Sequence, residues 1–165
     1  MLTRSLFAVA ALALSAVSAI AQYTTPAALP LPQEGTPVGR YAAKGVQIYV
    51  CEVEGGATEW HFKAPEAELF DAQGRPFAKH YAGPTWEAPD GSKTVGTALA
   101  SEPAAKTADI PWLLLSTQSS GSGVLGGVRF VERVNTSGGA GPTGACPRIG
   151  TERRVDYTAD YIFYK

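Results

Sequence analysis

The residues best suited to chemistry gather in one short stretch, residues 80–92. It holds a histidine, two carboxylates and two aromatic rings beside a turn, namely His80, Tyr81, Trp86, Glu87 and Asp90. Prolines at positions 84 and 89 restrict the backbone there, so these side chains lose little freedom when they are fixed in place. The stretch therefore predicts a preorganised polar pocket with an aromatic wall, as in many small-molecule sites.

The same residues also have a purely structural interpretation. Trp86 would fill the core, His80 would bond to the backbone, and Asp90 would cap its own turn. Under the functional interpretation, His80 either helps to bind a ligand or serves as a general acid or base beside Glu87 or Asp90 in an extracytoplasmic enzyme. Both interpretations stay open at this point, and no catalytic residue is assigned.

Two further segments supply candidates for ligand binding. Trp112, which follows Ile110 and Pro111, would form a second pocket wall. Arg133 and Asn135 end a predicted strand, where a guanidinium would suit a carboxylate ligand, although a surface ion pair is its more common role. The complete candidate set is His80, Trp86, Glu87, Asp90, Trp112, Arg133 and Asn135.

Metal and nucleotide sites are less well supported. His61 and His80 are the only histidines, and they do not have the spacing of a metal motif, so a metal protein that uses both is a weaker alternative. Residues 121–126 match G-x-G-x-x-G, but a β-branched run follows them where a dinucleotide site needs a helix. This segment is predicted to be a flexible Ser/Gly hairpin loop, and no cofactor is expected.

The N-terminus has the pattern of an export signal. Residues 1–21 begin with a basic Arg4, continue through an apolar run too short to span a membrane, and end in Ala-Ile-Ala. Residues 22–37 carry four prolines and are predicted to form an extended arm, with a single β domain over residues 38–165. The sequence therefore predicts a periplasmic or secreted protein.

Cysteine content and charge agree with export. Cys51 and Cys146 are the only cysteines, and an even pair in an oxidising compartment favours a disulfide over two buried thiols. The formal charge is −1, with no basic or acidic block, which argues against nucleic acid or an anionic membrane as the main partner. The partners that remain are a small molecule, a glycan or a surface partner, without stable membrane insertion.

Periodicity beyond the arm is that of strands. Residues 155–164 alternate most cleanly, residues 110–117 form a central apolar run, and residues 65–69 allow at most one helical turn. Turn residues occur at 71–74 and 88–92. The pattern predicts an all-β fold, an antiparallel β-sandwich or flattened β-barrel of about eight strands. The candidate strands are residues 45–53, 59–63, 67–70, 77–81, 94–100, 110–117, 128–135 and 155–164.

Several short blocks together carry a family resemblance over residues 34–165. They are residues 64–67, 71–74, 80–87, 90–92, 110–115, 133–139 and 157–164. In these blocks the chain resembles a domain-of-unknown-function family of exported bacterial and fungal proteins, some of whose fungal members carry the label malate dehydrogenase. The resemblance implies one secreted domain with its two cysteines paired, and it supplies no established catalytic residue. The dehydrogenase label has no support here, because the glycine motif lies in the wrong setting.

Overall fold

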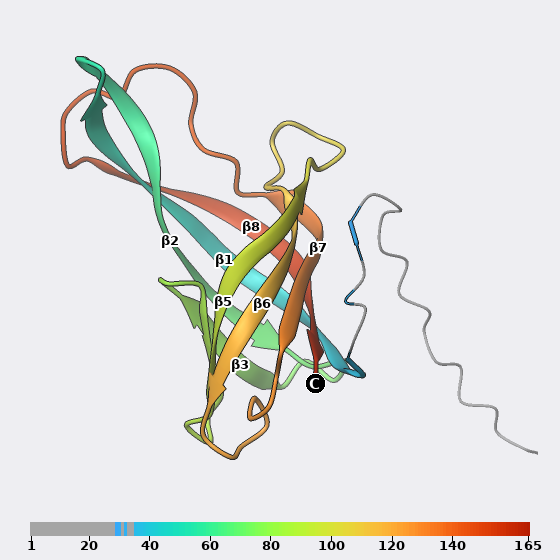
Figure 1. Ribbon diagram of the computed structural model, residues 1–165. Coiled ribbons are helices and arrows are strands. Elements are labelled where there is room, and N and C mark those ends of the chain that lie inside the picture. The colour runs from blue at the N-terminus through green and yellow to red at the C-terminus, as the bar shows by residue number, and fades with distance from the viewer. Residues whose placement is uncertain (1–28, 31, 33–34) are drawn as a thin grey trace, which may run out of the picture.

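The computed structural model describes residues 29–30, 32 and 35–165, so the predicted signal peptide and most of the proline-rich arm lie outside the described residues. Eight antiparallel strands follow one another around a closed barrel, and the last strand pairs with the first (Figure 1). The strands are β1 (Pro37–Glu54), β2 (Ala57–Phe70), β3 (Pro76–Tyr81), β4 (Thr85–Glu87), β5 (Lys93–Glu102), β6 (Trp112–Ser120), β7 (Phe130–Gly138) and β8 (Glu152–Tyr164).

The all-β prediction is confirmed, and the sheet closes into a barrel rather than a sandwich. Two strand predictions were wrong in detail. Residues 59–63 and 67–70 belong to one strand, β2, which also contains the segment expected to allow a helical turn. Pro65 is tolerated because β2 pairs with β3 only from Ala67 onwards, so its missing N–H costs no bond on that side. Strand β4 was not predicted, since three residues are too short for periodicity to reveal.

The barrel is closed at one end by the loop that joins β6 to β7. This loop contains the glycine motif, and no helix follows it, as predicted. Leu125 and Val128 turn inward from the loop and are fully buried in the inner core. The Asp90 carboxylate accepts a bond from the backbone N–H of Val124, and the Ser92 hydroxyl accepts one from Leu125. We call this end the floor.

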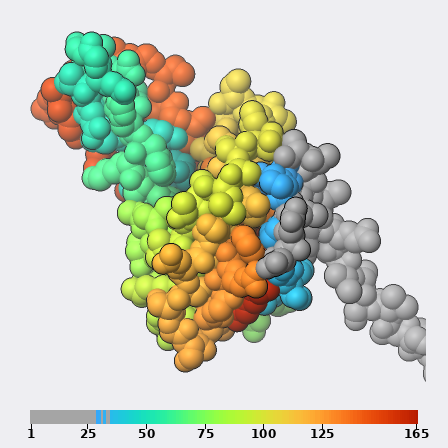
Figure 2. Space-filling model, in the orientation of Figure 1, coloured from blue at the N-terminus to red at the C-terminus, as the bar shows by residue number. Residues whose placement is uncertain are grey.

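The opposite end carries a projection, which we call the flap. It consists of the end of the β1–β2 hairpin (residues 49–62) and the long loop between β7 and β8 (residues 139–151), and it stands clear of the barrel in Figures 1 and 2. The predicted disulfide joins its two parts, because Cys51 lies on β1 and Cys146 on the loop. Backbone bonds between Cys51 and both Gly150 and Thr151 add to this connection. We call this end of the barrel the mouth.

A second apolar cluster lies on the outside of the barrel wall. Leu29 from the proline-rich arm is only 2% exposed and packs with Leu114, Val134 and Ile162. The arm was predicted only to be extended, and Leu29 joins this cluster because the outer faces of β6, β7 and β8 carry apolar side chains that are stabilised by burial. Leu114 outside and Leu115 inside confirm that this central strand is covered on both faces.

Candidate functional site

His80 and Trp86 are cross-strand partners in β3 and β4, and both side chains are buried inside the barrel. Their rings stack, with centroids 4.5 Å apart and planes 6° from parallel. Gly96 on β5 makes room for the indole, since a Cβ there would lie 3.1 Å from Trp86 Cζ3 and 2.9 Å from Leu115 Cδ2. Three successive strands, β3 to β5, therefore position the stacked rings of His80 and Trp86.

The protonation state of His80 follows from its surroundings. Its Nδ1 lies 2.9 Å from the carbonyl oxygen of Thr85, so this nitrogen carries the proton and donates it. Burial lowers the pKa of His80 to about 4, the Thr85 bond opposes that change, and the charge of Arg133 adds to it. His80 is thus neutral at physiological pH, with Nε2 left as an acceptor.

Tyr161 of β8 completes the aromatic cluster. Its ring meets the rings of His80 and Trp86 edge-on, at centroid distances of 5.2 and 5.5 Å. Its hydroxyl lies 3.3 Å from that of Tyr157. Burial raises the pKa of both tyrosines, and Arg133 opposes the rise, so both hydroxyls stay protonated. They offer neutral hydroxyl groups to the interior.

Arg133 of β7 brings a positive charge to the mouth. Its Nε and Nη2 donate to the carbonyl oxygen of Pro111, at 3.0 and 2.8 Å, which fixes the plane of the guanidinium. In the described part of the chain, no carboxylate lies within ion-pair distance of it. The surface ion pair considered from the sequence is thus not the role of Arg133.

These side chains border a cavity in the mouth with a volume of about 120 Å³. Its walls come from β1, β2, β3, β4, β6, β7 and β8 and from the turn between β3 and β4. Phe62, at the base of the flap, lines the cavity and is 56% exposed. The residues that argue for a site here are Gln47, Phe62, His80, Trp86, Arg133 and Tyr161.

Two residues that line the cavity each have a buried donor with no hydrogen-bond acceptor in the described structure. These donors are Nε2 of Gln47, a residue 2% exposed, and Nε1 of Trp86, a residue 1% exposed. Leaving such a group unpaired costs about 1–3 kcal/mol, so most buried polar groups are paired. Both atoms are hydrogen-bond donors, which suits a ligand or ordered water that accepts hydrogen bonds.

Glu87 and Asp90 do not join this site. Glu87 lies on the outer face of β4, where it accepts a bond from the Tyr81 hydroxyl at 2.7 Å and lies 3.2 Å from Lys93 Nζ. These two partners lower the pKa of Glu87. Asp90 lies at the floor and caps its own turn through the N–H and hydroxyl of Ser92. The proposed pairing of His80 with Glu87 or Asp90 as acid and base was therefore wrong.

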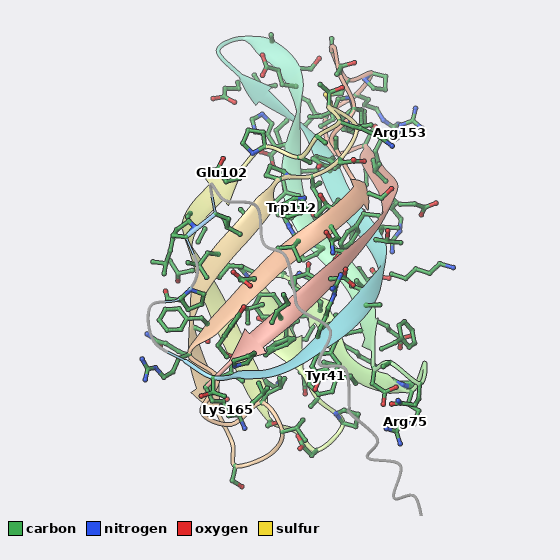
Figure 3. The ribbon with its side chains drawn as sticks, turned by 90° about the vertical axis from the view of Figure 1, so that its right-hand side faces the viewer. Tyr41, Arg75, Glu102, Trp112, Arg153 and Lys165 are labelled. Carbon is green, nitrogen blue, oxygen red and sulfur yellow. A yellow bond between two sulfur atoms is a disulfide. The ribbon has the colours of Figure 1, made fainter. Side chains whose placement is uncertain are left out.

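Trp112 and Asn135 also lie outside the cavity. Trp112 begins β6 and packs against the outer apolar cluster, near the upper end of the wall seen in Figure 3. Asn135 adopts a left-handed backbone conformation, with φ of 50°, in the irregular part of β7. Its amide donates to the Asp160 carboxylate, which also pairs with Arg40. Both residues make contacts within the barrel wall. The sequence analysis had instead proposed them as ligand-binding residues.

The two histidines are not brought together. His61 pairs across β1 with Val50 in the flap, whereas His80 pairs with Ala67, six residues further along β2, or about 20 Å away. A metal site that uses both imidazoles is therefore wrong. His61 instead lies beside Glu54, with Nε2 and Oε2 3.3 Å apart, and Glu59 is close to both. Both glutamates are exposed, and these three residues form a polar cluster at the surface of the flap.

Sequence reasoning missed Gln47, Phe62 and Tyr161. The alternation of residues 155–164 already placed Tyr161 on the apolar face, so its inward position was implied but its role was not. Gln47 is an amide within the largely apolar run of residues 45–51, which is the available signal for a buried amide. Nothing in the sequence marks Phe62, because its position depends on how far the flap extends beyond the barrel.

No helix within the described ranges is long and apolar enough to cross a membrane. Comparison of the chain with curated proteins and with solved structures gave no match. A family model described as a protein of unknown function, DUF3455, matches residues 32–165, which include the whole barrel and the flap. The chain therefore belongs to the DUF3455 family of proteins of unknown function.

Proposed function

We propose that this protein is an extracytoplasmic binding protein that holds a small molecule in the mouth of its barrel. The observation that carries the proposal is the cavity beside two buried, unpaired donors, Gln47 Nε2 and Trp86 Nε1. An eight-stranded barrel is just wide enough to be filled by side chains or to hold one small ligand. Here the floor is filled by Leu125 and Val128, and the space is left at the mouth.

The side chains of the site are held by contacts with one another, which favours binding. His80, Trp86 and Tyr161 contact one another through their rings, and Arg133 is fixed by Pro111. A ligand that enters does not need to order these side chains, so less of the interaction energy is spent on lost entropy. An acid–base role for His80 lacks such support, because its pKa is low and its described partner is a backbone carbonyl.

Native mass spectrometry tests this proposal directly. The protein is isolated from the exported fraction of its own host and sprayed without dialysis, and we expect a bound small mass. Leu113 is partly buried and lines the cavity, so Leu113→Trp should fill the space and remove that mass. Leu99→Trp, at a side chain 58% exposed on β5, is the matched control and should retain it.

Two results would contradict binding in the mouth. One is a parent protein that carries no additional mass, and the other is an equal adduct on the Leu113→Trp variant. Thermal unfolding of both tryptophan variants verifies that each is folded before the comparison is made.

The extracytoplasmic location has its own support and its own test. The Cys51–Cys146 disulfide suits an oxidising compartment, and residues 1–21 have the composition of a signal peptide. N-terminal sequencing of the exported protein should begin at Gln22. A mature chain that still starts at Met1 would argue against export through this signal.

A further inference from the structure

We infer that the ligand of the mouth cavity is a monocarboxylate with a flat apolar body, its carboxylate on Arg133 and its apolar end against Phe62. This inference rests on the proposed function, because it specifies the chemical class of ligand for the same cavity. It is carried by the charge of the cavity, by two buried donors on residues that line it and by its apolar rim.

Arg133 supplies the charge. The two bonds to Pro111 hold the guanidinium plane in place, and Arg133 also interacts with the Tyr161 hydroxyl. A guanidinium has five N–H donors, so donors remain for a ligand. A planar guanidinium matches a carboxylate with two parallel hydrogen bonds. Because a single arginine offers one positive charge, a singly charged carboxylate fits this site better than a phosphate dianion.

Two other polar groups of the lining favour the same chemistry, whereas Nε2 of the neutral His80 is an acceptor and favours a donor. Among the residues that line the cavity there is no Asp or Glu, and Lys63 at the rim is paired with Glu152 on the flap side. Gln47 Nε2 and Trp86 Nε1 both donate, and both lack an acceptor in the described structure. A ligand that brought further donors would leave these N–H groups unpaired, whereas carboxylate oxygens would accept from them.

The rest of the wall is apolar and sets the shape of the ligand. Leu113 and Leu115 line one side of the cavity, and Pro84 and Trp86 line another. Phe62 lies at the entrance with 56% of its surface exposed, although its ring makes edge contact with Tyr49. An exposed aromatic ring beside a polar cavity gives the apolar part of a ligand a surface to cover.

The volume limits the size of the ligand. A cavity of about 120 Å³ is comparable to one of roughly 150 Å³ that binds benzene. A carboxylate and part of one ring would therefore fill the interior, and the remainder would lie against Phe62. Benzoate is a suitable probe, with benzamide as its neutral isostere and benzylamine as its cationic counterpart.

The experiment follows the indole N–H resonance of Trp86 by NMR while each probe is added, and isothermal titration gives the dissociation constants. Trp86→Phe assigns the resonance among the three tryptophans. A hydrogen bond to a charged group is roughly twice as strong as one between neutral groups. Benzoate should therefore bind about tenfold or more tightly than benzamide, and benzylamine more weakly than both.

Arginine variants identify the residue responsible. Arg133→Gln should weaken benzoate binding about tenfold or more and leave benzamide nearly unchanged. Arg153→Gln removes the same charge from an exposed position on β8 and should leave both affinities unchanged. Arg133→Lys keeps the charge but not the planar fork, so its benzoate affinity should lie between those of the parent and of Arg133→Gln. This variant remains informative if Arg133→Gln does not fold.

The outcomes separate this inference from the proposed function. Benzamide or benzylamine that shifts the Trp86 resonance as strongly as benzoate would overturn the carboxylate assignment and leave binding in the mouth intact. Benzoate that binds equally well to Arg133→Gln would do the same. If no probe shifts the resonance, the ligand class is overturned, and the mass bound to the native protein decides the proposed function.

Discussion

The imidazole of His80 lies parallel to the indole of Trp86 at a centroid distance of 4.5 Å, and its Nδ1 proton is donated to the Thr85 carbonyl. One face of the imidazole and one of its ring nitrogens therefore contact other residues of the barrel. Burial then favours the neutral imidazole, which is why the pKa is lowered to about 4. The bond to the Thr85 carbonyl is the backbone bond expected if His80 has a structural role. His80 and Trp86 also line the cavity.

The low pKa of His80 predicts a loss of stability in acid. An unfolded histidine takes up a proton below pH 6.5, but the folded one does so only near pH 4, so the unfolded state binds more protons between these values. The free energy of unfolding should therefore fall by about 3 kcal/mol from pH 6.5 to 4 through this group. Urea unfolding of the parent and of His80→Gln across this range measures the difference.

His61→Gln removes the only other histidine, which lies in the flap, and is the matched control. It should keep the acid sensitivity of the parent, whereas His80→Gln should lose most of it. If the parent and His80→Gln lose equal stability between pH 6.5 and 4, His80 is not held neutral in the folded protein.

Glu132 predicts a pH dependence of opposite sign. It is fully buried on the outer side of the barrel wall, accepts a bond from the Tyr164 hydroxyl, and has no described partner at Oε1. Burial raises its pKa, and the Tyr164 bond opposes that rise. A raised pKa stabilises the fold at low pH, and this contribution is lost as the pH rises through the folded pKa.

Glu132→Gln should therefore unfold at a higher temperature than the parent at pH 8, by roughly 2–4 °C for each kcal/mol gained, and the advantage should shrink towards pH 4. Glu68→Gln makes the same change at an exposed position on β2 and should shift the midpoint little at either pH. A Glu132→Gln variant that is less stable than the parent at pH 8 would show that the ionised carboxylate is not a cost to the fold.

The sequence predicted most of the fold because alternation is a local signal. Residues 155–164 alternate over ten positions, and Tyr157 and Phe163 point inward as expected. The turn at residues 88–92 was equally clear from local sequence. Asp90 accepts a bond from the Ser92 N–H, and Gly91 adopts the positive φ that the turn requires. Closure of the barrel was not predictable in this way, because it depends on the pairing of β1 with β8 across the full length of the domain.

The site was only half predictable for the same reason. His80, Trp86 and Arg133 were found because their chemistry stands out, but Glu87 was included only for its closeness in sequence. Neighbouring residues in a strand point to opposite faces, so Glu87 lies outside because Trp86 lies inside. Gln47 and Tyr161 reach the cavity from β1 and β8, and no local pattern links them to His80.

Leu29 predicts a structural role for the arm. It packs with Leu114, Val134 and Ile162 on the outer wall and is almost fully buried. Leu29→Ala should lower the free energy of unfolding by about 2 kcal/mol, the lower end of the range for buried leucines. Urea unfolding followed by far-UV circular dichroism measures it.

Val38→Ala, at a side chain 46% exposed in β1, is the control and should change stability by less than about 0.5 kcal/mol. Equal effects of the two substitutions would mean that Leu29 does not contribute to the outer cluster in solution.

The disulfide predicts a local effect as well as a global one. Cys51 and Cys146 lie 95 residues apart in the sequence, and their replacement by serine should lower the free energy of unfolding by about 2–5 kcal/mol.

The flap should open locally before the barrel unfolds, because the disulfide joins the hairpin to the loop of residues 139–151. Trypsin should therefore cut after Arg148, an exposed residue beside the bridge, faster in the reduced protein. Lys106, exposed in the loop between β5 and β6 at the same end of the barrel, gives an internal control, and cleavage after it should proceed at the same rate in both forms. Equal cleavage after Arg148 with and without the disulfide would show that the backbone bonds of Cys51 to Gly150 and Thr151 are sufficient to hold the flap together.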